Sequence, residues 1–202
     1  MAKVKMTKTE LKAQRDSLKQ FTRFLPTLQL KKQQLQMEMR ASQARLRENE
    51  EKETALRKKL SSWLALFGDD TVTDKLKVLV NLERINAGEA NIAGVTVPVY
   101  QGVQLDVGEY DLFEEDSWID DAIEAVRAII ELNAEHEIIQ EQYNLLADEL
   151  RSTSQRVNLF EKVKIPECKD NIRRIQIYLG DMDTAAVARA KIAKSKNQEV
   201  AA

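Results

Sequence analysis

Residues 156–166 read RVNLFEKVKIP, and this stretch decides how the second half of the chain folds. It lies in a long run that lacks glycine until Gly180, a pattern typical of continuous helix. Val157 and Phe160 are three residues apart and therefore share one face of that helix. Pro166 has no N–H to donate, and its ring collides with the preceding turn of a helix. We therefore predict a kink or a change of packing phase at this proline.

The apolar spacing on either side of the stretch supports this prediction. Before it, a series with steps of three and four comprises Tyr143, Leu146, Leu150, Thr153, Val157 and Phe160. After it, the series resumes with Ile165, Cys168, Ile172, Ile175, Leu179 and Met182. The step from Phe160 to Ile165 is five residues, which is one more than a helical seam allows, so the seam is predicted to reposition there. We place this second long helix, with its basic tail, at residues 118–202.

The first part of the chain carries a matching seam. One seven-residue series holds Leu11, Leu18, Leu25, Met39, Leu46, Leu60 and Phe67, interrupted by Lys32 and Glu53. A second series holds Phe21, Leu28, Leu35, Leu56 and Trp63, interrupted by Ser42 and Asn49. Together they form the a and d positions of an imperfect heptad repeat. No glycine precedes Gly68, so we predict a coiled-coil helix within residues 1–67, capped by Thr7 or Thr9.

The middle of the chain, residues 68–117, has a different pattern. Residues 73–86 are spaced like a short amphipathic helix. Residues 91–107 are rich in β-branched side chains, and Gln101-Gly102 resembles a turn, so we predict a β-hairpin. Pro98 places its strand at an edge, because proline cannot donate to a ladder.

Two long seams on either side of a small insertion can bury each other if the chain folds back. We therefore predict a mainly α fold, a long antiparallel two-helix coiled coil formed by the N- and C-terminal helices. Its small central head contains a short helix and a β-hairpin. The two chain termini are then expected to meet at the far tip.

Composition agrees with an elongated molecule. Charged residues make up 32% of the chain and aromatic residues 5%, and there are only six glycines and three prolines. Residues 1–60 hold 16 basic and 7 acidic residues, and residues 61–124 hold 3 basic and 14 acidic, so the expected tip is basic and the head acidic. No apolar run of 18 residues and no signal peptide occur, so we expect a cytoplasmic protein without direct membrane insertion.

Motifs of catalysis are missing from the sequence. We find no P-loop, HExxH or CxxC, and we expect no catalytic residue, cofactor or metal. His136 is the only histidine and is predicted to lie on a helix surface, while Cys168, the only cysteine, is predicted to be a packed thiol. The acidic run over residues 106–124 is read as a solvated face or a surface for a basic partner. The basic tip lacks aromatic residues for base stacking, which argues against nucleic acid.

Two motifs add a resemblance to a known family. RVNLFEKVKIP at 156–166 resembles the RVNAxExVxIP signature of the D subunit of V-type rotary ATPases, including the archaeal and bacterial A/V-type enzymes. NIAGVTVPVY at 91–100 resembles the NxAGVxxPVF segment of that family. TKTEL at 7–11 and LKK at 30–32 fit its first helix.

The resemblance implies a non-catalytic central rotor shaft that couples ATP hydrolysis or synthesis to proton or sodium ion transport. It implies contacts with the catalytic hexamer of A and B subunits, with the F subunit, and with the funnel-shaped subunit over the membrane ring. The protein is then expected at the cytoplasmic face of the membrane through the complex. Shaft packing is expected from Arg156, Val157, Asn158, Phe160, Ile165 and Pro166. Tip contacts with the hexamer are expected from Lys8, Leu11, Arg189 and Lys191, and head contacts from Val95, Val97, Pro98 and Tyr100.

Two alternatives stay open from the sequence. A holdase chaperone of the prefoldin type also joins coiled-coil arms through β-hairpins, and it would grip unfolded clients with apolar arm tips, whereas the tips here are basic. A helical arm that binds RNA or DNA would show salt-sensitive binding.

Overall fold

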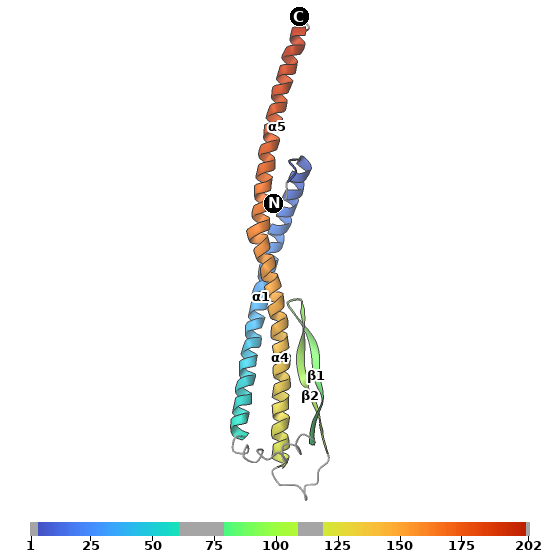
Figure 1. The fold of residues 1–202 in the computed structure, drawn as a ribbon, viewed down its shortest axis with the longest axis vertical. Coiled ribbons are helices and arrows are strands. Elements are labelled where there is room, and N and C mark those ends of the chain that lie inside the picture. Colours follow the sequence, from blue (N-terminus) through green and yellow to red (C-terminus); the bar gives the residue numbers. More distant parts are fainter. Residues whose placement is uncertain (1–3, 61–78, 109–118, 201–202) are drawn as a thin grey trace. The chain divides into compact units, whose positions relative to one another are not determined.

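The computed structural model describes residues 4–60, 79–108 and 119–200, and helices dominate it (Figure 1). In chain order the elements are α1 (Lys8–Leu60), β1 (Val80–Ile92), β2 (Val95–Val107), α4 (Ile119–Leu159), the π-helical turn η1 (Phe160–Lys164) and α5 (Ile165–Val200). The mainly α fold with long helices and a small hairpin is therefore confirmed. The chain forms two compact units, one from its two ends, up to Lys32 and from Ser152, and one from Gln33 to Arg151.

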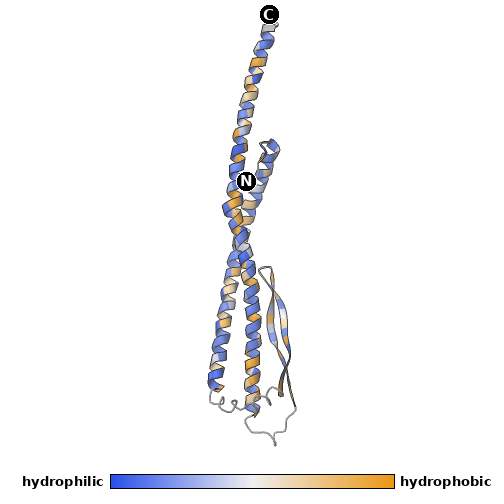
Figure 2. Ribbon diagram, viewed as in Figure 1, coloured by the Kyte–Doolittle hydropathy of each residue, from blue (hydrophilic) through white to orange (hydrophobic). Residues whose placement is uncertain are grey.

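The start and the buried face of α1 follow the predicted pattern. Thr7 caps the helix, since its Oγ1 accepts the N–H of Glu10 at 3.2 Å, which satisfies one of the free donors of the first turn. Apolar residues recur along α1, α4 and α5 between hydrophilic ones (Figure 2). The buried residues of α1 are Leu35, Ser42, Leu46 and Asn49. Ser42 and Asn49, two polar interruptions of the heptad series, therefore still face inward, which confirms the seam.

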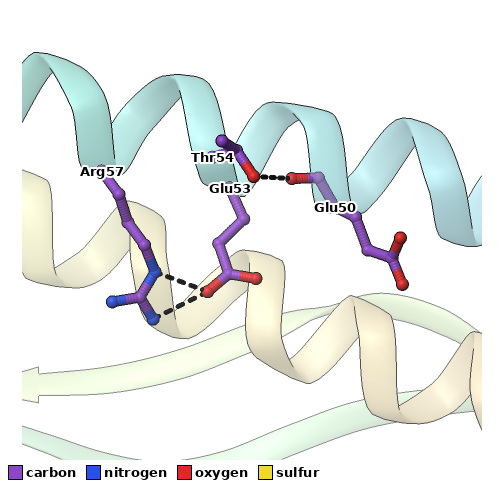
Figure 3. Close-up of polar contacts among 4 residues, drawn as sticks. All are labelled: Glu50, Glu53, Thr54 and Arg57. Carbon is purple, nitrogen blue, oxygen red and sulfur yellow. Dashed lines mark hydrogen bonds and ion pairs between the residues drawn. The ribbon is translucent and has the colours of Figure 1, made fainter.

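Local polar pairs support the last turns of α1. Arg57 donates from Nε at 2.8 Å to Oε1 of Glu53, four residues earlier, and its Nη2 lies 2.7 Å from the same oxygen (Figure 3). Thr54 donates its hydroxyl to the carbonyl of Glu50 at 2.8 Å (Figure 3). Exposed pairs at this spacing each stabilise a helix by about 0.2–0.5 kcal/mol.

Within the Gln33–Arg151 unit, α1 and α4 run antiparallel. Asn49 donates from Nδ2 to Oε2 of Glu135 at 3.0 Å. Leu35, fourteen residues earlier, belongs to the same cluster as Leu146, eleven residues later than Glu135. Position rises on one helix as it falls on the other, so the predicted antiparallel pairing is confirmed.

The hairpin turn lies at Ala93-Gly94 and not at Gln101-Gly102, so the predicted turn was wrong. Ala93 and Gly94 have φ values of 52° and 82°, and Asn91 Oδ1 accepts the Gly94 N–H at 3.0 Å. Two positive φ values in a two-residue loop match the right-handed twist of the flanking strands. Gln101-Gly102 instead lies inside β2, where Gly102 has a φ of 134°.

Two bulges explain the remaining errors in the middle of the chain. Gln101 is an extra residue on β2, because Asn86 pairs with Gly102 while Ala87 pairs with Tyr100. Likewise, Glu83 is an extra residue on β1. Side chains on one face of a strand are normally two residues apart, and the extra residue makes one of these steps three residues long. The resulting spacing resembles a helix, so the helix predicted for 73–86 is wrong from Val80 onward; residues 73–78 lie outside the described part.

Two hydrophobic clusters hold the hairpin against the helices of its unit. At the chain-entry end of the hairpin, Val80 and Leu105 pack with the first turns of α4, including Ile119, Ala122 and Ile123. Near the turn, the cluster of Leu35, Val97 and Leu146 joins α1, β2 and α4, with Met39, Ala90, Ile92, Ala93, Val95 and Leu150 packed around it. The hairpin is therefore one wall of the core of this unit.

In the unit formed by the chain ends, the five-residue step is a π-helical turn. The N–H of Ile165 bonds to the carbonyl of Phe160, five residues back, in place of the usual four. The wide turn ends at Lys164, two residues before Pro166, so the change in helical hydrogen bonding coincides with the proline, which has no N–H to donate. Cys168 and Ile175 are buried beyond it, which confirms the predicted change of phase.

Candidate functional site

The segment 156–166 presents two faces. Inward, Val157 is 4% exposed and the ring of Phe160 lies 4.9 Å from that of Phe21 on α1, tilted by 52°. Outward, Arg156, Asn158 and Pro166 are exposed. Half of the residues expected to pack the shaft therefore face away from the coiled coil and are available to other molecules.

The outward face of this segment also carries apolar side chains. Leu159 is 44% exposed and Val163 is 49% exposed. Leu159 directly precedes the π-helical turn, and Val163 lies within it.

The four expected tip residues do not lie together. Phe21 of α1 lies beside Phe160. The two antiparallel helices rise by the same distance per residue, so Lys8 lies beside a position about 13 residues after Phe160. Arg189 lies about 16 residues farther along α5, or about 24 Å at 1.5 Å per residue. Figure 1 shows α5 continuing past the start of α1. The expectation that the two termini meet was therefore wrong.

The last part of α5 is a single helix with exposed apolar side chains. Ile175 is the last fully buried residue of the seam. Beyond it, the exposed fractions are 57% for Ile177, 46% for Met182, 57% for Val187 and 57% for Ile192. Residues 184–198 carry four basic side chains and no acidic one. Because these apolar residues are five apart, they point to different sides of the helix, so this end of α5 offers exposed apolar side chains interspersed with basic ones.

The four expected head residues are at least partly buried. Val97 is 1% exposed because it packs against Leu35 and Leu146, with Val95 beside it. The carbonyl of Pro98 accepts a hydrogen bond from Nε2 of Gln142 on α4. These three residues are therefore engaged within the chain.

Tyr100, the fourth head residue, lies near acidic side chains of α4. Burial, and then the charges of Glu131 and Glu135, raise the pKa of the Tyr100 phenol. An open groove of about 460 Å³ lies nearby, between the end of β2 and the first turns of α4. Its lining residues are Val107, Asp120, Ile123, Glu124, Arg127, Ala128 and Glu131.

The two residues considered for chemistry are both at least partly buried. Cys168 is buried, as predicted, and burial raises the pKa of its thiol, which reduces the thiolate fraction at neutral pH. His136 is half-buried, with a covered Nδ1, so it is less exposed than predicted. Among the described residues, no three metal-ligating side chains cluster. No described helix is long and apolar enough to cross a bilayer.

Sequence reasoning missed two buried polar contacts, Asn49 with Glu135 and Gln142 with Pro98. A signal for the first existed, because Asn49 interrupts a seam position that then faces inward. Gln142 gave no such signal, since it lies beside the seam series. It is buried because α4 packs against the hairpin as well as against α1.

Comparison with known proteins identifies the family of this chain. The family model for the D subunit of ATP synthase matches residues 10–195. The chain belongs to the ATP synthase D-subunit family. It is 43% identical to a V-type ATP synthase D subunit of Borreliella burgdorferi over 195 residues, which cover 96% of this chain and 95% of the relative. It is 33% identical to the V-type ATP synthase D subunit of Chlamydia muridarum over 198 residues, 98% of each chain.

Proposed function

We propose that this D-subunit chain is the central rotor shaft of a V/A-type rotary ATPase. In this role it couples ATP hydrolysis or synthesis in the catalytic hexamer of A and B subunits to proton or sodium ion transport. It performs no chemistry itself and works at the cytoplasmic face of the membrane. The observation that carries the proposal is the single-helix end of α5, whose apolar residues lack a partner helix in this unit.

A slim helix of this kind suits the axial hole of a ring of subunits. Its exposed apolar side chains, which point to different sides of the helix, would contact a wall that surrounds it; they are Ile177, Met182, Val187 and Ile192. The basic side chains, which include Arg189 and Lys191, would lie beside acidic or dipolar groups of that wall. Family membership supports this placement, because the matched relatives are subunits of V-type ATP synthases.

The unit that holds the hairpin offers a different surface. The groove beside Val107 carries Asp120, Glu124 and Glu131 against the single cation Arg127, which pairs with Glu131 at 3.3 Å. We assign this groove, with the hairpin, to contacts with the F subunit and the funnel-shaped subunit over the membrane ring. We assign the outward residues Arg156 and Asn158 to the surface of the shaft that rotates against the surrounding subunits.

Two matched deletions test the placement. Ending the chain after Leu179 removes the single-helix end of α5 and leaves the buried Ile175. Joining Leu79 directly to Gly108 removes the hairpin, and the join is short because the Gly108 N–H already bonds to the Leu79 carbonyl at 2.9 Å. Each variant is co-expressed with the A and B subunits, and the complex is isolated and weighed intact.

We expect one copy of the full chain with three copies each of A and B. The α5 truncation should lose hexamer binding, and the hairpin excision should keep it. In the complete membrane-bound ATPase, the excision should weaken coupling of ATP hydrolysis to ion transport. Loss of hexamer binding in the excision, with retention in the truncation, would reverse the placement. A chain that forms homo-oligomers and suppresses aggregation of unfolded clients would instead favour the prefoldin-like holdase.

A further inference from the structure

The hairpin is a long arm attached to the chain at one end. Its two strands have 13 residues each, so its turn lies about 40 Å from its entry at about 3.3 Å per residue. The Gly108 N–H closes the entry end by bonding to the Leu79 carbonyl. A two-stranded ribbon of this length is only marginally stable by itself, so contacts with the helices decide where the arm lies.

Those contacts are uneven along the arm. One cluster covers the entry end around Val80 and Leu105, and the other covers the turn end around Val97. Between them, most of β1 from residue 81 to residue 87 is exposed, while Ile85 and, on β2, Tyr100 and Val103 are half-buried. The turn end is therefore held by a buried cluster of its own, distinct from the one at the entry end.

A single side chain of α4 bonds to the backbone of the arm at the turn-end cluster. Pro98 pairs with Glu89, and a proline is tolerated in a ladder only where its missing N–H would point away from the partner strand. At such a position the carbonyl points outward as well. Gln142 fills this position by donating Nε2 to the Pro98 carbonyl.

The burial of Gln142 makes this bond consequential. Its side chain is 4% exposed, and its Oε1 is covered and accepts no hydrogen bond from the described residues. A buried amide with one unmet acceptor is less favourable than an apolar side chain of the same size. Packing alone would therefore favour leucine at this position. The hydrogen bond from Gln142 Nε2 to the Pro98 carbonyl explains why a glutamine is there.

We infer that Gln142 is the positioning residue that fixes the turn end of the hairpin on α4, so that the arm docks and releases as a unit separate from the coiled coil. Tyr100, two residues beyond Pro98 on the same strand, lies near Glu131 and Glu135 of α4, which agrees with a docked arm. The inference is independent of the rotor proposal, because it concerns the isolated chain.

The test is hydrogen exchange of the full chain with three variants. Gln142→Leu keeps the volume and removes the donor. Gln142→Glu places a carboxylate against the Pro98 carbonyl at neutral pH but regains a donor when protonated in mild acid. Gln140→Leu is the matched control, because Gln140 bonds to Asn144 on its own helix at 3.1 Å.

Release of the arm should appear as lost protection at residues 90–99 alone. We expect protection there to fall on the order of tenfold in Gln142→Leu and in Gln142→Glu at pH 7, with α1 and α4 unchanged. Protection in Gln142→Glu should return toward wild type at low pH, measured against wild type at the same pH. The control should behave as wild type.

Three results would overturn the inference. One is unchanged or higher hairpin protection in Gln142→Leu, which would show that the apolar cluster alone holds the arm. Another is an equal loss across hairpin and helices, which would make Gln142 part of one common core. The last is a Gln142→Glu defect that persists on acidification.

Discussion

Replacing Leu35 with alanine should cost about 3–4 kcal/mol of unfolding free energy. Leu35 is fully buried in the cluster that joins α1, α4 and the hairpin. Alanine removes three carbons, worth about 2.4 kcal/mol at about 0.8 kcal/mol per buried methylene. The cavity adds to this, because packed walls collapse only in part, and measured Leu-to-Ala costs span about 2.7–5.0 kcal/mol.

The matched control is Leu30→Ala on the same helix. Leu30 is 65% exposed, so the same change of side chain and of helix propensity should cost less than about 0.5 kcal/mol. Urea unfolding followed by circular dichroism at constant m-value gives both numbers. Combining Leu35→Ala with Val97→Ala should give less than the sum of the two single costs, by about 0.5 kcal/mol or more, because the residues share one cavity. Equal costs for Leu35→Ala and Leu30→Ala would refute the assigned core.

Further predictions concern contacts in both units. Asn49→Ala should lower the unfolding free energy by about 1–2 kcal/mol, since Glu135 loses a donor at 3.0 Å, and a cost near zero in urea unfolding would contradict this. A double-mutant cycle of Phe21→Ala and Phe160→Ala should give a coupling of about 0.5–1.5 kcal/mol, and additive costs would argue against the ring contact. The pKa of Tyr100 is raised from 10.0 in the fold, so its contribution to stability is intact below that pH and is lost as pH rises above it. Tyr100→Phe should therefore lose less unfolding free energy than the wild type as the pH rises from about 9 to about 11. An identical loss of unfolding free energy in the variant would contradict the assignment.

The heptad seam could be predicted from the sequence because buried positions repeat even where a polar residue occupies them. Ser42 and Asn49 interrupt the apolar series, yet both are buried at 3% exposure. Likewise, the five-residue step between Phe160 and Ile165 predicted the place of the phase change. Periodicity over many turns averages out single exceptions, which is why the long helices were confirmed.

The hairpin was harder to predict because its pattern depends on pairing between distant residues. Glu83 is an extra residue only in relation to the partner strand, so its effect on spacing is invisible along β1 alone. Ala93 also gives no turn signal by residue type, although it adopts a positive φ. Gly94, which adopts a positive φ readily, and the Asn91 hydrogen bond favour that turn together with the strand pairing.

The reach of α5 was missed for a different reason. The helix continues well past the residue that lies beside Lys8, and the apolar pattern alone does not show how far each arm extends. The positions of Arg189 and Lys191 as tip residues therefore stay a prediction for α5 alone. Gln142 was missed because a position beside a two-helix seam becomes buried only when a third element packs there.

The wide turn at Phe160–Lys164 has a consequence for how this chain can change in length. A π-helical turn is an α-helix that holds one inserted residue, and it absorbs that residue without rotating the helix beyond it. Losing Val163 would close the turn and convert a step of five into a step of four, which leaves Cys168 and Ile175 facing the same way. An equal loss elsewhere in α4 or α5 would rotate every later side chain by about 100° and expose the seam. The turn is therefore a place where the long helix can lose one residue and keep its buried face in register.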